Sequence, residues 1–232
     1  MTAGVLWLIP TLLGEANPAD VLPETVLLRT RSLRYFMAEE PKSARAFLKA
    51  ITHPEPMASL RIERIQDSDP DALLAPLREG LDAGLLSEAG CPAVADPGAS
   101  IVRCAHEAGI RVAPLTGPSS LLLALMASGL EGQRFAFHGY LPVKEDERAR
   151  AIRSLEERSR AARETEIFIE TPYRNMAMLR ALLSVCRNNK WLCVATDLTL
   201  ASESVTTRRI GQWRGVLPDI NKRATVFLLL AA

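Results

Sequence analysis

The sequence is poor in the residues that build metal centres and disulfide frameworks. Its 232 residues include only three histidines and four cysteines, and no two cysteines form a CxxC pair. Scattered cysteines argue against both a zinc site and a disulfide framework, and they fit the reducing conditions of a cytoplasm. We therefore expect a cytoplasmic protein without a bound metal. The cysteines are Cys91, Cys104, Cys186 and Cys193.

The sequence also lacks an apolar run long enough to cross a membrane. The longest run, Leu121–Ala127, is far shorter than the roughly 20 apolar residues that a spanning helix needs. The apolar start has no basic leader and is interrupted by Pro10, Gly14 and Glu15, so we expect a buried strand there rather than a signal peptide. We expect no membrane partner.

Neither sign of charge dominates the sequence. Lys and Arg number 28 and Asp and Glu 27, which gives a formal charge of +1, and no strongly basic or acidic half stands out. Global charge therefore gives no support for nucleic-acid binding, although it does not exclude it. A charged segment at 145–163 mixes arginines with acidic residues, which is more typical of a solvated helix with i,i+4 ion pairs than of a basic RNA-facing stripe.

Short apolar runs alternate with helical patterns in the first half of the sequence. This alternation is typical of an α/β domain with a parallel sheet. We expect three helices, over residues 32–50, 68–81 and 99–108, and Ser68 is the expected N-cap of the second. We expect strands over residues 5–9, 26–28, 60–65, 85–87 and 110–113.

The pattern changes in the second half, where some strands follow one another without a helix between them. Such an order favours a mixed, partly antiparallel sheet. The expected strands cover residues 135–138, 167–169, 192–195, 204–210 and 225–230, and the expected helices 120–127 (capped by Ser119), 145–163, 174–185 and 211–216. The sequence thus predicts an α/β protein of two α/β domains, residues 1–116 with a parallel sheet and residues 117–232 with a mixed sheet.

Two loops rich in glycine and proline each precede a helix in the middle of the chain. The first runs from Ser87 to Gly98 and the second from Leu115 to Ser120. Gly90 and Gly98 permit backbone shapes closed to other residues, and loops of this kind can present N–H groups to a carboxylate or phosphate. A plain strand-to-helix connection explains the first loop equally well, and helix capping explains the hydroxyls of the second better than ligand binding does.

The order and spacing of these loops resemble the tetrapyrrole methylase superfamily, and within it the ribosomal RNA 2′-O-methyltransferase I group. Four motifs carry the resemblance in chain order: Glu88-Ala89-Gly90-Cys91-Pro92, Ala95-Asp96-Pro97-Gly98, Ala108-Gly109-Ile110-Arg111-Val112 and Thr116-Gly117-Pro118-Ser119. Leu8–Thr11 with Gly14, Gly139–Pro142, Phe168–Arg174 and Asp197–Thr199 with Glu203 also match. The resemblance therefore spans nearly the whole chain.

The sequence departs from that group mainly in the part that would hold a substrate. Glu88, Cys91 and Thr116 replace the usual Asp, Thr and Pro. Glu40–Ser43 stands where the group has Glu-Asp-Thr-Arg, a His-Asp-His-Asn-Glu stretch is absent, and Asp197–Leu200 lacks an Arg and a Lys. The sequence ends at its last expected strand, where some relatives carry an extra basic module.

The resemblance implies a two-domain methyltransferase fold that holds S-adenosyl-L-methionine between its domains, and a homodimer. It implies ribosomal RNA as the substrate. Two alternatives remain: the acceptor is a tetrapyrrole or another small molecule, or the protein is a non-catalytic relative that binds the cofactor. The residues that it implies for cofactor binding are Pro10, Thr11, Leu12, Glu88, Ala89, Gly90, Ser119, Ser120, Leu141, Leu198 and Thr199.

A hydroxyl acceptor needs a general base, and carboxylates near the loops are the candidates. Glu88 and Asp96 are the predicted catalytic residues, with organisation of the loop through backbone hydrogen bonds as the alternative role for both. Glu39 and Glu40 are further candidates for the base on the substrate side, but both are expected to be solvated helix residues. Cys91 is expected to be a small loop residue, because no neighbouring histidine would activate it as a nucleophile.

Overall fold

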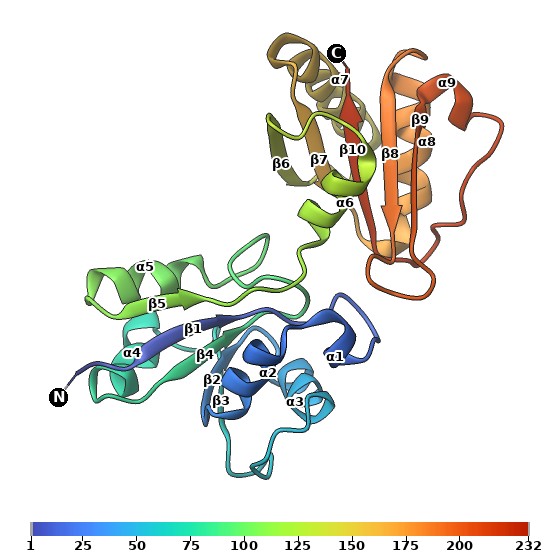
Figure 1. Cartoon of the computed structure of the whole chain (residues 1–232). Helices are drawn as coiled ribbons and strands as arrows, with labels where there is room; N and C mark the ends of the chain where they lie inside the picture. Colours follow the sequence, from blue (N-terminus) through green and yellow to red (C-terminus); the bar gives the residue numbers. More distant parts are fainter. Residues whose placement is uncertain (1, 232) are drawn as a thin grey trace. The chain divides into compact units, whose positions relative to one another are not determined.

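A computed structural model describes residues 2–231. The chain divides into two compact units, Met1–Ser119 (unit 1) and Ser120–Ala232 (unit 2), which are described separately (Figure 1). The division follows Ser119, whereas the sequence pattern placed a boundary after Thr116. Within residues 2–231 no helix is both long and apolar enough to cross a bilayer.

Unit 1 contains a five-stranded sheet in the order β3-β2-β4-β1-β5, and all its strand pairs are parallel. The fold prediction for this half is therefore confirmed. The strands are β1 (Val5–Ile9), β2 (Tyr35–Ala38), β3 (Arg61–Arg64), β4 (Ala83–Leu86) and β5 (Arg111–Pro114). The helices are α1 (Pro18–Val21), α2 (Glu24–Arg31), α3 (Pro41–Ala50), α4 (Pro70–Arg78) and α5 (Ala99–Glu107).

Helices cover both faces of this sheet, as a parallel sheet requires (Figure 1). On one face, Leu73, Leu74 and Ile101 of α4 and α5 pack with Leu85 of β4. On the other face, side chains of α2 and α3 form a second cluster with Phe36 of β2. Both faces of the strands are thereby removed from water, which is the main source of stability in such a domain.

Two predictions for residues 26–50 are wrong. Residues 26–28 belong to α2 and not to a strand, because Val26, Leu27 and Thr30 form one buried helical face. Residues 32–50 are not one helix, because β2, which is buried on both faces, precedes α3. The proline at position 41 disfavours a helical conformation at Glu40, so a helix cannot run unbroken through this point.

The predicted cap of α4 is also wrong by one residue. The N-cap is Asp69, whose carboxylate accepts a hydrogen bond from the Asp71 N–H at 3.3 Å, and not Ser68. Pro70 occupies the first helical turn and keeps the preceding residue extended, with φ −64° and ψ 129°. The proline therefore selects Asp69 as the capping residue.

Unit 2 contains a mixed five-stranded sheet in the order β6-β7-β10-β8-β9, which confirms the prediction. Strands β6 and β7 pair in parallel, and the other neighbours are antiparallel. The strands are β6 (Phe135–Tyr140), β7 (Thr165–Ile169), β8 (Trp191–Thr196), β9 (Ser204–Arg209) and β10 (Thr225–Leu230). The helices are α6 (Ser120–Ser128), α7 (Glu145–Ala162), α8 (Asn175–Val185), α9 (Ile210–Trp213) and the 3₁₀ turn η1 (Pro172–Arg174).

The core of unit 2 lies between its sheet and helices α7, α8 and α9. Phe168 and Phe227 stack at the centre of this core, with ring centroids 5.7 Å apart. Trp213 of α9 is buried there, and its indole N–H donates to the carbonyl of Leu192 at 3.0 Å. Helix α6 contacts β8, β9 and β10.

Candidate functional site

Three loops of unit 1 meet at the carboxyl end of its sheet. They follow β1, β4 and β5, and since these strands are parallel neighbours, their carboxyl ends lie on one edge. The Thr11 N–H donates to the carbonyl of Gly90 at 2.9 Å, and the Thr11 hydroxyl donates to the carbonyl of Ser87 at 3.4 Å. The Ser87 hydroxyl donates to Gly90 O at 3.1 Å. Ligands of open parallel sheets bind at this edge.

Glycines allow these loops to approach one another closely. Gly90 has φ +77°, a left-handed conformation that favours glycine. A Cβ atom added at Gly117 would lie 2.2 Å from Cγ of Pro10, closer than real Cβ atoms come. The Cys91 thiol completes the packing by contacting the carbonyl of Pro118 at 3.4 Å. The arrangement is therefore built mainly from backbone, as a small polar ligand requires.

The loop between β4 and α5 contains backbone strain. Ala93 and Ala95 have φ angles of 64° and 65°, which non-glycine residues adopt only at a cost of about 1–3 kcal/mol each. Gly98 follows with φ 133°. Such strain clusters at functional sites.

Three carboxylates lie at this edge of unit 1. Burial raises the pKa of Asp96, and the charge of Glu88 raises it further. Burial also raises the pKa of Glu39, and the charges of Asp96 and Glu88 add to this effect. Glu88 itself is exposed. The three groups are therefore close enough to interact electrostatically.

The expectation that Glu39 is a solvated helix residue is wrong. Glu39 follows directly after β2, whose last residue Ala38 pairs with Leu86 of β4, and its side chain is only partly exposed. Its neighbour Glu40 instead caps α3, because its carboxylate accepts from the Lys42 N–H at 3.1 Å. The sequence names Glu39 as a candidate base, but the wrong helix over residues 32–50 hides its position directly after a buried run of four residues.

The thiol of Cys91 does not have the environment of a nucleophile. Burial raises its pKa, so that less of the reactive thiolate forms at neutral pH. Among residues 2–231 no group of three or more His, Cys, Asp and Glu side chains has an arrangement that could hold a metal ion.

In unit 2 the turn between β8 and β9 holds two of the predicted cofactor residues. Asp197 and Thr199 both have left-handed backbone conformations, with φ 50° and 71°. The Thr199 N–H donates to the Glu203 carboxylate at 2.7 Å. The Thr199 hydroxyl is buried and has no hydrogen-bond partner among the described residues. An unsatisfied buried hydroxyl is unusual in a native protein, and a bound ligand would explain it.

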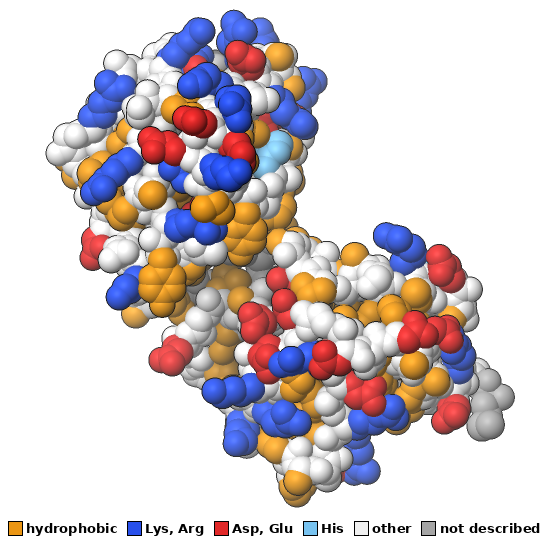
Figure 2. Space-filling model, turned by 180° about the vertical axis from the view of Figure 1, so that it is seen from behind, with side chains coloured by type: hydrophobic (Ala, Val, Ile, Leu, Met, Phe, Trp, Pro, Cys, Tyr) orange, Lys and Arg blue, Asp and Glu red, His pale blue; other side chains and the backbone are white. Residues whose placement is uncertain are grey.

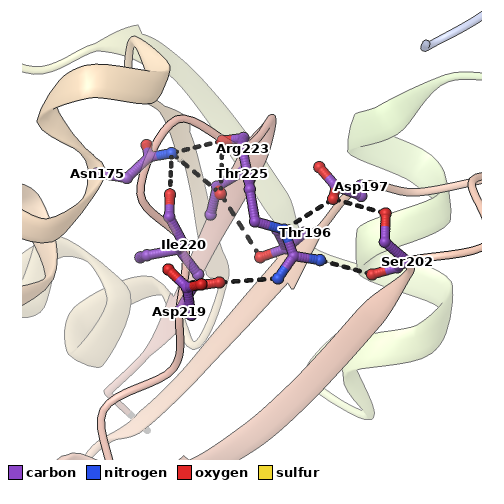
Figure 3. Close-up of polar contacts among 8 residues, drawn as sticks. All are labelled: Asn175, Thr196, Asp197, Ser202, Asp219, Ile220, Arg223 and Thr225. Atoms are coloured by element: carbon purple, nitrogen blue, oxygen red, sulfur yellow. Dashed lines mark hydrogen bonds and ion pairs between the residues drawn. The ribbon is translucent and has the colours of Figure 1, made fainter. Parts of the chain in front are cut away.

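Arg223 fixes this turn from a distant part of the sequence (Figure 3). Its guanidinium donates to the Asp197 carboxylate at 2.7 Å and to the carbonyls of Ser202 at 2.6 Å and Asp219 at 2.8 Å. The Ser202 hydroxyl donates to the same carboxylate at 2.8 Å. Fully buried Asn175 holds the backbone of Arg223 by donating to its carbonyl at 2.6 Å. No motif in the sequence pointed to Arg223.

This network borders a cavity of about 220 Å³ that is lined by Thr196, Thr206 and Trp213. Pockets for drug-sized ligands usually have volumes of roughly 300–1,000 Å³. The cavity is therefore too small to hold a whole nucleoside cofactor.

The predicted cofactor residues are divided between the two units. Pro10, Thr11, Leu12, Glu88, Ala89 and Gly90 lie on the three loops or beside them, together with Ser119 at the end of unit 1. Ser120, Leu141, Leu198 and Thr199 belong to unit 2. Leu141 and Leu198 are buried, and Leu141 is part of the unit 2 core. A role of these unit 2 residues in cofactor binding stays a prediction.

Known proteins resemble the chain over nearly its whole length. The ribosomal RNA small subunit methyltransferase I of Escherichia coli O157:H7 is 31% identical over 98% of this chain and 77% of its own. The protein of the same name from Xylella fastidiosa is 32% identical over 99% of this chain and 81% of its own.

Solved structures show the same fold at lower identity. The methyltransferase CobJ has a TM-score of 0.62 at 16% identity and covers 100% of this chain and 95% of its own. Cobalt precorrin-4 methyltransferase, CbiF, has a TM-score of 0.61 at 13% identity over 97% and 94% of the two chains. The family model of the Tetrapyrrole (Corrin/Porphyrin) Methylases matches residues 18–213. The chain therefore belongs to the tetrapyrrole methylase family and is a methyltransferase by descent.

Proposed function

We propose that this chain is an S-adenosyl-L-methionine-dependent methyltransferase that methylates a ribose 2′-hydroxyl of small-subunit ribosomal RNA. The observation that carries the proposal is the identity of about 30% with small-subunit ribosomal RNA methyltransferases along almost the whole chain. The solved methyltransferases CobJ, uroporphyrin-III-C-methyltransferase and CbiF share the fold at only 13–18% identity. We also propose that the protein acts in the cytoplasm as a homodimer.

The residues at the carboxyl edge of unit 1 fit this cofactor. The contacts of Gly117 with Pro10 and of Gly90 with Thr11 bring the loop backbones together without intervening side chains, which suits a site built from main-chain groups for a polar molecule. In unit 2 the unpartnered hydroxyl of Thr199 offers a hydrogen bond that no described residue uses. When bound, S-adenosylmethionine supplies an activated methyl group on a positively charged sulfur.

The carboxylates Glu39, Glu88 and Asp96 supply the base in this proposal. A raised pKa makes Asp96 and Glu39 stronger bases than free carboxylates, and general-base assistance contributes roughly 10²–10⁴-fold to a rate. One of these groups would take the proton of the acceptor hydroxyl. The loops contribute alignment, which in well-oriented reactions corresponds to effective molarities of about 10⁵–10⁸ M.

The direct test uses purified protein, labelled methyl donor and small ribosomal subunits from a strain that lacks the corresponding gene. We expect label in the ribosomal RNA, recovered after nuclease digestion as a 2′-O-methylated nucleoside. Asp96→Asn should lower kcat by about 10²-fold or more while the cofactor Kd stays within about twofold, since a lost base affects the chemical step.

Other outcomes of this experiment identify the alternatives. Label in a small pigment fraction from the same cell lysate would assign a tetrapyrrole or another small molecule as acceptor. Cofactor binding by calorimetry without transfer to any fraction would assign a non-catalytic relative. No binding of S-adenosylmethionine at millimolar concentration would contradict the proposal in every form.

A further inference from the structure

The charge of the chain is unevenly divided, although its sum is close to zero. Unit 1 has 11 Lys and Arg against 15 Asp and Glu, a formal charge of −4, whereas unit 2 has 17 against 12, a charge of +5. Neither unit is strongly charged, but the two units differ in the sign of their charge. Figure 2 shows many Lys and Arg side chains over unit 2.

Four arginines of unit 2 gather at one end of its sheet, where β8 begins and β9 ends. Arg209 and the start of β8 are paired across the strands, and the Arg209 guanidinium lies 4.4 Å from the ring centroid of Trp191. Arg208 lies over Trp213 at 5.3 Å. We call this group, Arg187, Arg208, Arg209 and Arg214, the basic surface.

Hydrogen bonds hold the elements that carry the basic surface against one another. Arg209 donates to the carbonyl of Asn189, and the N–H of Gly211 donates to the carbonyl of Asn188 at 3.0 Å. Arg214 donates to the carbonyl of Leu183 in α8 at 2.9 Å. The loop from α8 to β8, the end of β9 and α9 are therefore fixed relative to one another, and Arg209 and Arg214 flank the four residues of α9.

Few acidic groups neutralise the basic surface. Within residues 2–231 no carboxylate lies within 4 Å of the guanidinium groups of Arg208, Arg209 or Arg214. Arg187 has one partner, the mostly buried Glu156, at 3.6 Å. Since a guanidinium has five N–H donors in a planar fork, Arg209 and Arg214 retain most of theirs. Stacking on tryptophan also orders Arg209 before any ligand arrives.

We propose that the basic surface binds the phosphate backbone of the RNA substrate. Arginine forks match phosphate oxygens in pairs, and ordered cations lose less entropy on binding than mobile ones. The proposal rests on the proposed function only for the choice of RNA as the partner. The surface lies at the opposite end of β8 from Asp197, roughly 17 Å away by strand geometry.

The test measures RNA affinity against salt for the double variant Arg209→Gln with Arg214→Gln. Each phosphate contact contributes about 0.7 to the slope of log K against log salt on single strands and about 0.9 on duplexes. We expect the slope for 16S ribosomal RNA to fall by about 1.4–1.8, and affinity in 0.1 M salt to fall about 25- to 60-fold, which is that change in slope extrapolated from 1 M salt. Arg209→Lys with Arg214→Lys should keep most of the slope, because the charges remain.

The matched control is Arg150→Gln with Arg153→Gln, which removes the same charge from the exposed face of α7. It should leave the slope within error of the wild type, and all variants should bind S-adenosylmethionine equally and unfold at similar temperatures. Two results would overturn the proposal for the basic surface and leave the proposed function intact. One is an equal loss of RNA affinity in both double variants. The other is no loss of affinity in Arg209→Gln with Arg214→Gln while the wild type binds RNA.

Two further results concern the identity of the partner. A wild-type protein that binds no RNA at any salt would contradict both the basic surface and the proposed acceptor. The wild type could instead bind phosphatidylglycerol vesicles, and the variant Arg209→Gln with Arg214→Gln could lose that binding while its RNA binding stays unchanged. This result would identify the partner as an anionic lipid surface and overturn the proposal.

Discussion

The two units hold their predicted cofactor residues by different means. In unit 1 three loops touch through backbone groups, as in the 2.9 Å bond from Thr11 to Gly90, and glycine at 117 leaves space for Pro10. In unit 2 the β8–β9 turn depends on side chains, above all on Arg223 and its bond to Asp197. The loops of unit 1 can touch because glycine has no side chain. The turn of unit 2 holds its shape because one particular side chain, that of Arg223, is present.

This difference determines which substitutions each unit tolerates. A loop built from close backbone approach is sensitive to any added atom, even a methyl group. A turn held by one arginine is sensitive to the loss of that arginine and tolerates changes elsewhere. The four predictions below test the contrast in order of decreasing effect.

The largest effect is expected for Gly117→Ala. Its Cβ would lie 2.2 and 2.3 Å from two atoms of the Pro10 ring, which is rigid, so the loops must separate. Overpacking of this kind costs about 1–3 kcal/mol, and the same displacement of the loops should weaken cofactor binding roughly 10- to 100-fold. Chemical denaturation and calorimetry measure the two effects.

Gly132→Ala is the control for this change, since nothing lies within 4 Å of its added Cβ. It should alter neither quantity. If Gly117→Ala also left both unchanged, the close approach of the loops would be unimportant for binding, and the contrast between the units would not hold.

Arg223→Ala comes next. It leaves Asp197, whose side chain is only 11% exposed, without its cationic partner, and it removes two hydrogen bonds to the turn and a third to the carbonyl of Asp219. We expect a loss of about 2 kcal/mol in the free energy of unfolding, below the roughly 3–5 kcal/mol of a fully buried pair. Arg78→Ala breaks an exposed ion pair of unit 1 with Asp71 and should cost clearly less stability than Arg223→Ala.

A double-mutant cycle with Asp197→Asn separates the ion pair from the rest of the network. The loss on Arg223→Ala should shrink in the Asp197→Asn background, because no buried charge is then left unpaired. Equal losses in both backgrounds would show that the carbonyl contacts to Ser202 and Asp219 hold the turn instead.

These contrasts also explain what the sequence could and could not predict. Gly90, Gly98 and Gly117 were recognisable because a glycine beside a proline marks special backbone by itself. The alternation of strands and helices indicated both sheets correctly. Arg223 could not be recognised, because its partner Asp197 is 26 residues away and either residue alone resembles a surface charge.

The errors in residues 26–50 have a related cause. Tyr35–Ala38 is a run of four buried residues, too short for periodicity to separate a strand from a helix turn. Its identity as a strand is decided by β3 and β4 on either side, which are distant in sequence. The mistake made Glu39 a weaker candidate for the base than Glu88 and Asp96, since a residue placed on a helix is expected to face solvent.

Thr199→Val should produce a smaller effect with opposite signs in its two readouts. The buried hydroxyl has no partner among the described residues, so its replacement by an isosteric methyl should leave stability unchanged or raise it by about 1 kcal/mol. Both side chains are β-branched, so the strain at φ 71° is common to both. Cofactor affinity should fall about fivefold if the hydroxyl binds the ligand. A lower stability with unchanged affinity would exclude Thr199 from the cofactor site.

The smallest effect is expected for Asp96→Asn on stability. Burial, and then the charge of Glu88, raises the pKa of Asp96 in the folded protein above its ordinary value. Such a group favours the folded state below its ordinary pKa and loses that contribution as pH rises through the raised one. The neutral variant should therefore be more stable than the wild type at pH 7–8, by less than about 1 kcal/mol for a partly exposed group, and equal to it near pH 3. Denaturation at both pH values measures this difference. If the variant and the wild type differed in stability by the same amount at both pH values, the asparagine would act through packing. Unit 1, like unit 2, would then depend on a specific side chain at its site.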